Sequence, residues 1–327
     1  MQFEGAMADS PINFPNGPMP IVIARMGQSP FNRSIWQGFV RGFSRLGFSV
    51  AQVEAKQVPD PSAFQSRPRL FLAIHGGNTS PESVTRYRKC GIPTAVYLLD
   101  EPYEVDRSTL WARLYDSVFS VDRATVPVHS HFSHAHYLPL GYDDEVFHPG
   151  GPRIESDILV LGSCYGIRSS LLGPLLTKWG DSVTWVGPSW KKFCSQGTHL
   201  DGYVTPERCA EFYRGANIVL NIHRESCWSH FGNLNTRKIT ATHLNPRFWE
   251  AAACKACQLT TPREDLQLYA PGAHTFKTPE ELDHQLDLFS GDEQARNQCA
   301  SYMFEQVREG SYLNRSRHIA QVMGLLT

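Results

Sequence analysis

The chain has 327 residues, and at a usual domain size of about 150 residues this length predicts two domains, each able to bury its own core. Its 31 basic and 32 acidic residues leave a formal charge of −1, so no strong overall field draws it to nucleic acid or to an anionic membrane. The longest purely aliphatic runs have four residues, far from the roughly 20 that cross a bilayer.

The N-terminal segment and the cysteines bear on where the protein resides. Residues 1–19 contain several prolines but lack the basic and apolar regions of a signal peptide, so we expect a flexible tail there. Eight cysteines are too sparse for a disulfide scaffold and are expected to stay free thiols. Together these features predict a cytoplasmic protein.

Residues 20–148 alternate short apolar runs with amphipathic segments. Strands are expected at 20–25, 48–53, 70–74, 94–99, 117–121 and 136–139, and helices at 34–46 and 81–90. Repetition of strand, helix and strand predicts a doubly wound parallel sheet with helices on both faces, as in Rossmann-like domains.

A Pro-Gly-Gly-Pro stretch at 149–152 is the strongest linker signal in the chain, and the same alternation restarts after it. Strands are expected at 157–162, 182–186, 217–222 and 256–260, and helices at 169–179, 206–215, 246–254, 279–289, 292–309 and 312–326. We therefore expect a second α/β domain at 149–305 and a C-terminal helix within 306–327 that packs back toward the first domain. Ligands of such sheets bind beyond the carboxyl ends of the strands, here in the cleft between the domains.

A glycine-containing turn at 162–168 follows one of these strands and precedes a helix. Backbone N–H groups at Gly162, Ser163 and Tyr165 are positioned as in phosphate-binding turns, with Arg168 as a charged clamp. The turn is neither G-x-G-x-x-G nor a Walker A loop, and a plain tight turn explains it equally well.

The segment from Asn245 to Ala253 is more informative. Asn245 can cap a helix that starts at Pro246, and Arg247 then places a cation in the first turn, where the helix dipole favours anions. A bound anion would remove that conflict, and the Glu250 carboxylate one turn later could accept both hydroxyls of a ribose. The alternative is a solvated Arg247–Glu250 pair worth a few tenths of a kcal/mol.

Two polar clusters follow strand ends in the first domain. His75-Gly76-Gly77 and Asp100-Glu101 should both face the cleft, where a histidine or carboxylate could orient or deprotonate an acceptor hydroxyl. A tight turn at residues 75–77 and a helix cap at Asp100 are the alternatives.

Residues 223–245 form a polar connection of about twenty residues where two to six are usual. Its side chains, Arg224, Trp228, His230 and Arg237 among them, suit a loop that faces a sugar or an acceptor, and a disordered surface insertion is the alternative. His223, at its start, is a candidate for binding the donor.

Four histidines at 129, 131, 134 and 136 would point to opposite faces of an extended segment, so we predict no metal site there. We expect instead that one of them lines the cleft.

Several motifs in order resemble a known family. They are N-x-R-F-x-E-A-A-A-C at 245–254, a short strand followed by Thr261 and Asp265-Leu266, Thr278-Pro-Glu-Glu-Leu282, and the segments 97–102 and 137–149. From about residue 90 to 290 the chain resembles CgeB-like spore-maturation glycosyltransferases, which belong to the GT-B class and are similar to its retaining, nucleotide-sugar-dependent members. The resemblance implies two Rossmann-like domains facing a central cleft, the first on the acceptor side and the second binding the donor.

Carried over by position, the resemblance makes Glu250 the ligand of the donor ribose and makes Arg168 and Arg247 candidates for the diphosphate. Two departures are Thr242, where retaining relatives often carry an acidic residue, and Lys255, where a glycine is common.

The implied reaction moves a hexosyl or pentosyl group from a UDP-, GDP- or dTDP-linked donor to an acceptor hydroxyl, with retention. The absence of a D-x-D sequence fits a mechanism without a metal or other cofactor. The acceptor stays open among a glycan, a protein, a small molecule and a modified nucleobase. Alternatives are a non-catalytic nucleotide-sugar-binding protein, suggested by Thr242, and an enzyme acting on modified DNA bases, which the lack of a basic stripe disfavours.

Overall fold

The computed structural model describes residues 19–27, 30–226 and 232–326. The tail expected at residues 1–19 lies almost entirely outside the described residues, as do Trp228 and His230.

Within the described N-terminal half, six parallel strands form one sheet in the order β2-β1-β3-β4-β5-β6. The strands are β1 (Ile21–Arg25), β2 (Val50–Glu54), β3 (Leu70–Ile74), β4 (Thr94–Leu98), β5 (Ser117–Ser120) and β6 (His134–Tyr137). The helices around this sheet are α1 (Pro30–Arg45), α2 (Pro81–Lys89), α3 (Val105–Ala112) and α4 (Val126–His129). Residues of β3 and β4 are buried throughout, as continuous apolar strands of a parallel sheet should be.

Within the described C-terminal half, five parallel strands form a second sheet in the order β11-β10-β7-β8-β9. They are β7 (Ser156–Leu161), β8 (Val183–Val186), β9 (Thr198–Leu200), β10 (Ala216–Asn221) and β11 (Gln258–Thr260). The helices are α5 (Ile167–Leu172), α6 (Leu176–Trp179), α7 (Trp190–Phe193), α8 (Pro206–Gly215), α9 (Pro246–Ala253), α10 (Leu266–Tyr269), α11 (Pro279–Gly291) and α12 (Glu293–Val307).

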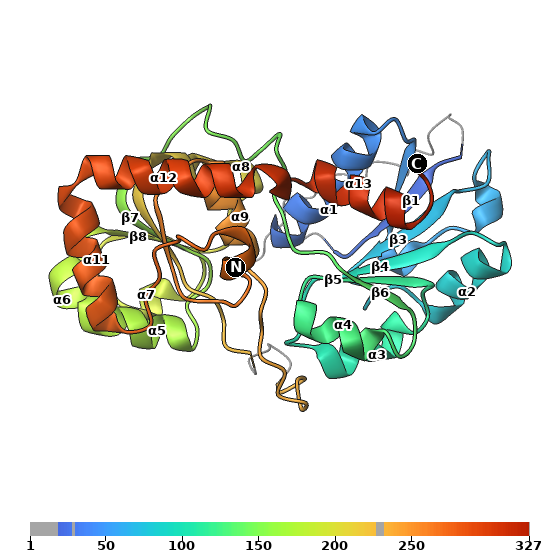
Figure 1. Cartoon of the computed structure of the whole chain (residues 1–327), viewed down its shortest axis with the longest axis horizontal. Coiled ribbons are helices and arrows are strands. Elements are labelled where there is room, and N and C mark those ends of the chain that lie inside the picture. Colours follow the sequence, from blue (N-terminus) through green and yellow to red (C-terminus); the bar gives the residue numbers. More distant parts are fainter. Residues whose placement is uncertain (1–18, 28–29, 227–231, 327) are drawn as a thin grey trace.

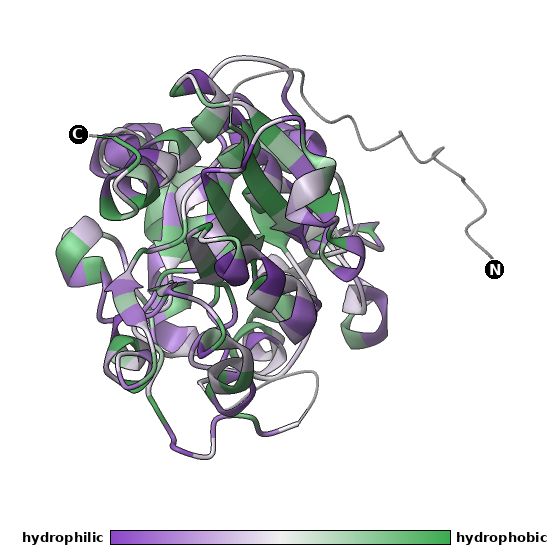
Figure 2. Cartoon of the chain, turned by 90° about the vertical axis from the view of Figure 1, so that its right-hand side faces the viewer, coloured by the Kyte–Doolittle hydropathy of each residue, from purple (hydrophilic) through white to green (hydrophobic). Residues whose placement is uncertain are grey.

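Two α/β sheets with helices on both sides confirm the fold class predicted from the alternating pattern (Figure 1). The single helix expected at 169–179 is divided into α5 and α6, because Pro174 lies in a short 3-10 turn between them. Strand β9 was not predicted, since its residues are mostly exposed and lack an apolar run. Figure 2 shows the N-terminal sheet as an apolar layer between more polar helices.

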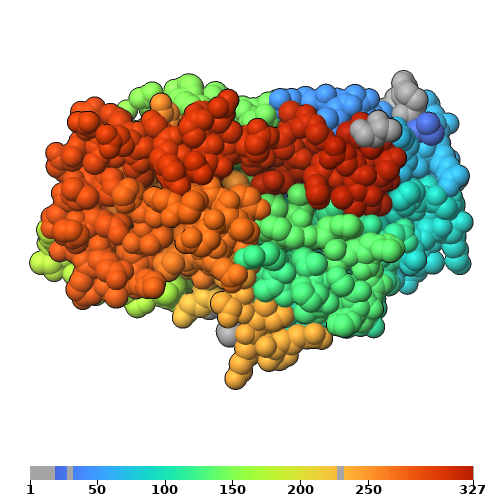
Figure 3. Space-filling view, in the orientation of Figure 1, coloured from blue at the N-terminus to red at the C-terminus, as the bar shows by residue number. Residues whose placement is uncertain are grey.

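The last helix, α13 (Tyr312–Val322), returns to the N-terminal half and packs on α1 (Figures 1 and 3). The rings of Phe39 and Tyr312 lie 4.9 Å apart, and Ser316 Oγ donates to the Phe39 carbonyl oxygen at 3.4 Å. Gly38 and Gly42 make the close approach possible, because a Cβ at either would overlap α13. The C-terminus of the chain thereby ties the two halves together.

None of the helices within the described residues is both long and apolar enough to cross a membrane.

Candidate functional site

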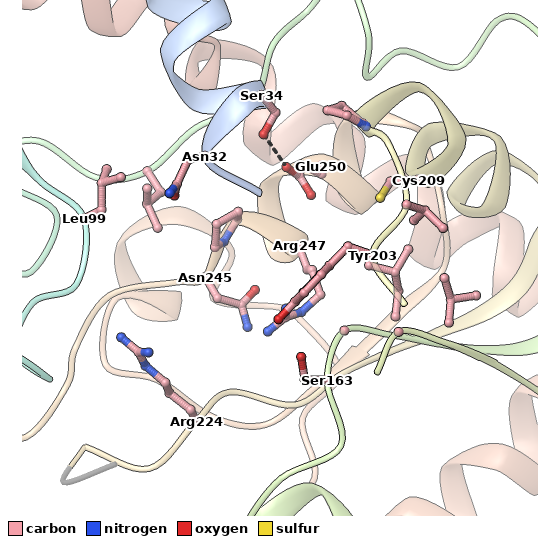
Figure 4. A pocket seen from close by; sticks show the side chains of 18 of the residues that line it. Asn32, Ser34, Leu99, Ser163, Tyr203, Cys209, Arg224, Asn245, Arg247 and Glu250 are labelled. Atoms are coloured by element: carbon pink, nitrogen blue, oxygen red, sulfur yellow. Dashed lines mark hydrogen bonds between the residues drawn. The ribbon is translucent and has the colours of Figure 1, made fainter. Parts of the chain in front are cut away.

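A cavity of about 390 Å³ lies between the two sheets, at the carboxyl ends of their strands. Loops after β1 and β4 line one side, and loops after β7, β8, β9 and β10 line the other. The start of α9 completes the wall with Asn245, Arg247 and Glu250 (Figure 4). The cavity therefore occupies the place where the sequence analysis expected ligands to bind.

Arg168 is almost fully buried, and its guanidinium donates hydrogen bonds to nearby backbone carbonyl oxygens. Its Nη1 donates to the Ser163 carbonyl oxygen at 2.7 Å, and its Nε and Nη2 donate to the Ile222 carbonyl oxygen at 3.2 and 3.1 Å. These bonds join the turn after β7 to the end of β10. Burial, and next the charge of Arg247, lower the pKa of Arg168 to about 9.

Gly162 allows Arg168 and Arg247 to come together. Its φ is +118°, and a Cβ there would lie 2.9 Å from an Nη1 atom of each arginine. The Tyr165 ring lies 4.4 Å from the Arg168 guanidinium. Burial acts to raise the pKa of this phenol, but the charges of Arg168 and Arg247 lower it overall. This wall of the cavity thus concentrates positive charge and suits an anion.

Helix α9 begins as its sequence predicts. Asn245 Oδ1 accepts a hydrogen bond from the Phe248 backbone N–H at 3.0 Å, and Asn245 Nδ2 donates to Asn221 Oδ1 at 2.8 Å. Glu250, one turn into the helix, is 8% exposed, and Ser34 Oγ of α1 donates to its Oε1 at 3.5 Å (Figure 4). Burial raises the pKa of Glu250 to about 7, although the charge of Arg247 opposes the rise.

Asp100 belongs to the cavity wall and is held by two cationic or polar partners. Arg224 Nη2 donates to Asp100 Oδ1 at 2.6 Å, and His75 Nε2 lies 3.4 Å from Asp100 Oδ2. Burial acts to raise the pKa of Asp100, but the His75 hydrogen bond and the Arg224 charge hold it well below its usual range. The Arg224 guanidinium also stacks 3.4 Å from the Tyr103 ring centroid. A carboxylate this acidic is a weak base, so Asp100 suits positioning Arg224 better than deprotonating an acceptor.

The expectation that Glu101 faces the cleft is wrong. Its side chain is buried on the other side of the loop, where Ser108 Oγ donates to Oε1 and His129 Nε2 lies 3.2 Å from the same oxygen. Asp100 and Glu101 lie in the turn that follows β4, and of the two only Asp100 lines the cavity.

Other predicted residues lie near the cavity without lining it. His75 reaches it only through Asp100, while Gly76 and Gly77 lie against Trp111. His223 is buried beside Thr261, with Nδ1 3.1 Å from the threonine Oγ1, and burial holds its pKa well below the usual value.

The long connection after β10 crosses from the C-terminal half to the N-terminal half. The Thr236 backbone N–H donates to Asp106 Oδ2 at 2.7 Å, and the Asp106 N–H donates to the Leu234 carbonyl oxygen at 3.0 Å. Asn235, fully buried, bonds to the Ser226 and Ile239 backbones. The described part of this connection is therefore an ordered bridge. Arg237 is exposed on it and does not line the cavity.

The histidine cluster also differs from its prediction. His129 ends helix α4 and is fully buried beside Glu101, and only His134 and His136 lie in a strand. None of the four is among the residues that line the cavity, so the expectation that one of them does is wrong. Across the described residues, no group of three or more His, Cys, Asp or Glu side chains is arranged to hold a metal ion.

Two residues missed by the sequence analysis hold this site together. Asp122, just after β5, bonds to Thr242 and His243 across the cleft, and His243 lines the cavity. The sequence could have indicated Asp122, because this aspartate follows strand β5 in the same way that Asp100 follows β4. Strand β5 pairs with β4 so that Ser120 lies beside Leu98, and each aspartate comes two residues later.

Comparison with known proteins finds a family model and a curated relative that match parts of the chain. Residues 168–323 match the glycosyl transferase-like family. The chain is 28% identical over 237 residues to the spore protein CgeB of Bacillus subtilis (strain 168), covering 69% of this chain and 70% of that protein.

Two solved structures share the fold across nearly the whole chain. An α-glucosyltransferase in complex with UDP and a 13-mer DNA containing an HMU base has a TM-score of 0.65 at 11% identity, covering 94% of this chain and 98% of that one. A glycosyltransferase involved in avilamycin A biosynthesis has a TM-score of 0.58 at 12% identity, covering 94% and 97%. The family match concerns the C-terminal half of the chain, and the likeness to the solved structures shows the fold. The chain thus has the GT-B fold, and the resemblance to CgeB-like glycosyltransferases predicted from its sequence is confirmed.

Proposed function

We propose that this protein transfers a sugar from a nucleoside diphosphate donor to an acceptor hydroxyl, without a metal and with retention, and that the donor is UDP-linked. The arrangement of Glu250, Arg247 and Arg168 along one wall of the cavity carries the proposal. Glu250 and Arg247 are one helical turn apart on α9, and Arg168 meets Arg247 beside Gly162. A ribose carboxylate ligand followed by two cations matches the order of groups in a nucleoside diphosphate.

The chemistry follows from where charge develops. When the bond between the sugar and the diphosphate breaks, negative charge grows on the leaving phosphate, and fixed cations near it lower the barrier. Arg247 and the capped start of α9 supply positive charge at that point, and Arg168 holds the adjacent turn in place. These groups can supply the stabilisation that a metal ion would otherwise provide.

The donor assignment draws on the relatives. The α-glucosyltransferase with the same fold was solved with UDP, which favours a UDP-linked sugar over GDP- or dTDP-linked ones. The resemblance to retaining enzymes favours retention. The acceptor is taken to approach from the N-terminal half, where Asp100 and Arg224 form the opposite wall.

Calorimetry with UDP, GDP, dTDP and their glucose conjugates tests the proposal. We expect UDP to bind the wild type and Arg247→Ala to weaken that binding at least tenfold, a loss of about 1.4 kcal/mol. Arg208→Ala is the matched control, because Arg208 lies on α8 in an exposed pair with Glu211. If the wild type binds none of these nucleotides, the proposal is wrong.

A binding protein without turnover is the second candidate, because of Thr242. Its Oγ1 is hydrogen-bonded to Asp122 Oδ1 at 3.1 Å, and so is committed to the cleft wall rather than to a donor. Release of UDP from UDP-sugars, measured with glycan, peptide, small-alcohol and hydroxymethylated-DNA acceptors, distinguishes the two. Nucleotide binding with no release in any arm would favour the second candidate.

A further inference from the structure

Asp122 and His243 form a paired side-chain unit across the cleft. Asp122 follows β5 in the N-terminal half, and His243 lies on the bridge from the C-terminal half, two residues before the cap of α9. His243 Nδ1 lies 2.9 Å from Asp122 Oδ2. Asp122 is fully buried, and His243 is 3% exposed yet lines the cavity.

The hydrogen bonds around Asp122 decide the tautomer of His243. The carboxylate accepts from the backbone N–H groups of Thr242 and His243 at 2.8 and 3.2 Å, and from that of Ala124 at 2.9 Å. Although burial acts to raise the pKa of Asp122, its bonds to His243 and to these N–H groups lower it overall, so the group is ionised. An ionised carboxylate only accepts hydrogen bonds, so Nδ1 of His243 must carry a proton. In the neutral ring, Nε2 is then an acceptor.

The neighbours of His243 fix the ring and its electrostatic setting. The Tyr103 ring packs against it edge to face, with centroids 5.4 Å apart, and Arg224 stacks on Tyr103. A lone pair at Nε2 repels phosphate oxygens but accepts a hydrogen bond from an alcohol.

The order of the side chains along the cavity indicates which alcohol group would lie beside His243. In the close-up, Arg247 and Asn245 lie between Glu250 and Arg224 (Figure 4). If Glu250 holds the ribose and Arg247 the diphosphate, the region of Arg224, Tyr103 and His243 lies beyond the diphosphate, where the sugar of the donor must be.

We propose that His243 accepts a hydrogen bond through Nε2 from a hydroxyl of the transferred sugar, and that Asp122 is the positioning residue that orients it. This inference rests on the proposed function. Because the two residues come from different halves, the sugar contact is complete only when the cleft is closed around the donor. The pair thus couples closure to recognition of the sugar.

Binding measurements separate a sugar contact from a nucleotide contact. We expect His243→Ala to leave the Kd for UDP within twofold of the wild type. The Kd for whichever of UDP-glucose, UDP-galactose and UDP-N-acetylglucosamine binds the wild type best should rise about tenfold, and UDP release from it should fall at least tenfold. His284→Ala, an exposed position on α11, is the control. Equal losses for UDP and the UDP-sugar, or no loss for either, would overturn the inference.

A second readout needs no donor. In protein labelled with ¹⁵N-histidine, nitrogen chemical shifts should show His243 protonated at Nδ1 and bare at Nε2. Asp122→Asn can donate its amide N–H to Nδ1, so the proton should move to Nε2 and sugar binding should weaken as in His243→Ala. A wild-type proton on Nε2 would contradict the pair alone. A wild type that binds no nucleotide would instead defeat the proposed function, and the sugar contact with it.

Discussion

In the proposed function, Glu250 links ribose binding to proton binding at a single carboxyl. Its pKa of about 7 means that much of the population is protonated at neutral pH, whereas accepting both hydroxyls of a ribose requires the ionised form. If Glu250 holds the ribose as proposed, nucleotide binding must displace this proton. Ser34 of α1 donates a hydrogen bond to the Glu250 carboxyl, so this carboxyl is also in contact with the N-terminal half.

The affinity for UDP should fall as the pH is lowered. Below pH about 7 the cost of removing the Glu250 proton grows, so the Kd should rise about fivefold between pH 7 and pH 6, and the rise per pH unit should approach tenfold below pH 6. Titration calorimetry from pH 5.5 to 8.5 measures this slope. Glu250→Gln should bind more weakly and lose that part of the slope, and an unchanged slope in the variant would show that another group is responsible.

The same carboxyl should destabilise the unliganded protein at high pH. Its pKa is raised in the folded state, from 4.5 to about 7, so its contribution to stability is present below pH about 4.5 and lost as the pH rises through about 7. The full difference corresponds to about 3 kcal/mol. Urea unfolding should thus show Glu250→Gln gaining stability relative to the wild type between pH 5 and pH 8. A gap between the two proteins that stays constant with pH would refute this assignment.

Arg168 and Arg247 differ in what they hold, although both were predicted to bind the diphosphate. Arg168→Ala leaves the Ser163 and Ile222 carbonyl oxygens without their donors and should cost about 2 to 3 kcal/mol of unfolding free energy. Arg247→Ala should leave stability within about 0.5 kcal/mol while weakening UDP binding. Denaturant melts of the two variants, run beside calorimetry, check this division. Equal stability of both variants would show that the Arg168 bonds contribute little.

At the scale of elements, the cap of α9 is a structural feature that, in the proposed function, also supports nucleotide binding. Asn245→Ala removes the bond to the Phe248 N–H and leaves Asn221 without its donor, for an expected cost of about 1 to 2 kcal/mol. Thr205→Ala at the start of α8 removes a comparable cap and is the matched control. Both should lower the thermal midpoint, but only Asn245→Ala should also weaken UDP binding. Parallel behaviour of the two caps would contradict a role for α9 in the site.

The elements that the sequence predicted best are those whose signal is local. Buried strands such as β3 and β4 are continuous apolar runs, and the start of α9 is marked by the capping residue Asn245 followed by Pro246. Side-chain pairs across the cleft could not be predicted from the sequence. Asp122 and His243, for example, are 121 residues apart and meet only when both sheets are in place. Glu101 was misassigned for a related reason, since its partner His129 sits on a helix expected to be extended.

At the scale of the whole molecule, three aspartates of the N-terminal half bind the long connection that follows β10. One lies after β4, one on α3 and one after β5. Asp100 binds Arg224, Asp106 binds Thr236, and Asp122 binds Thr242 and His243. In return, Asp265 of the C-terminal half bonds to Tyr137 and Arg123 of the N-terminal half. The cleft is therefore closed by polar contacts on one side and by the return of α13 on the other.

The α1–α13 contact should govern how firmly the halves are joined. At Gly42, an added Cβ would overlap Ser316 Oγ and lie 2.7 Å from the Tyr312 carbonyl oxygen, which is backbone and cannot rotate away. Gly42→Ala should therefore cost about 2 to 3 kcal/mol and expose the segment after residue 311 to proteolysis. Gly291→Ala meets nothing within 4 Å and should be neutral or slightly stabilising. Because Gly42 does not line the cavity, UDP affinity measured below the melting transition should change little in Gly42→Ala. A Gly42→Ala protein that melts and resists protease like the Gly291→Ala control would show that α13 is not what joins the halves.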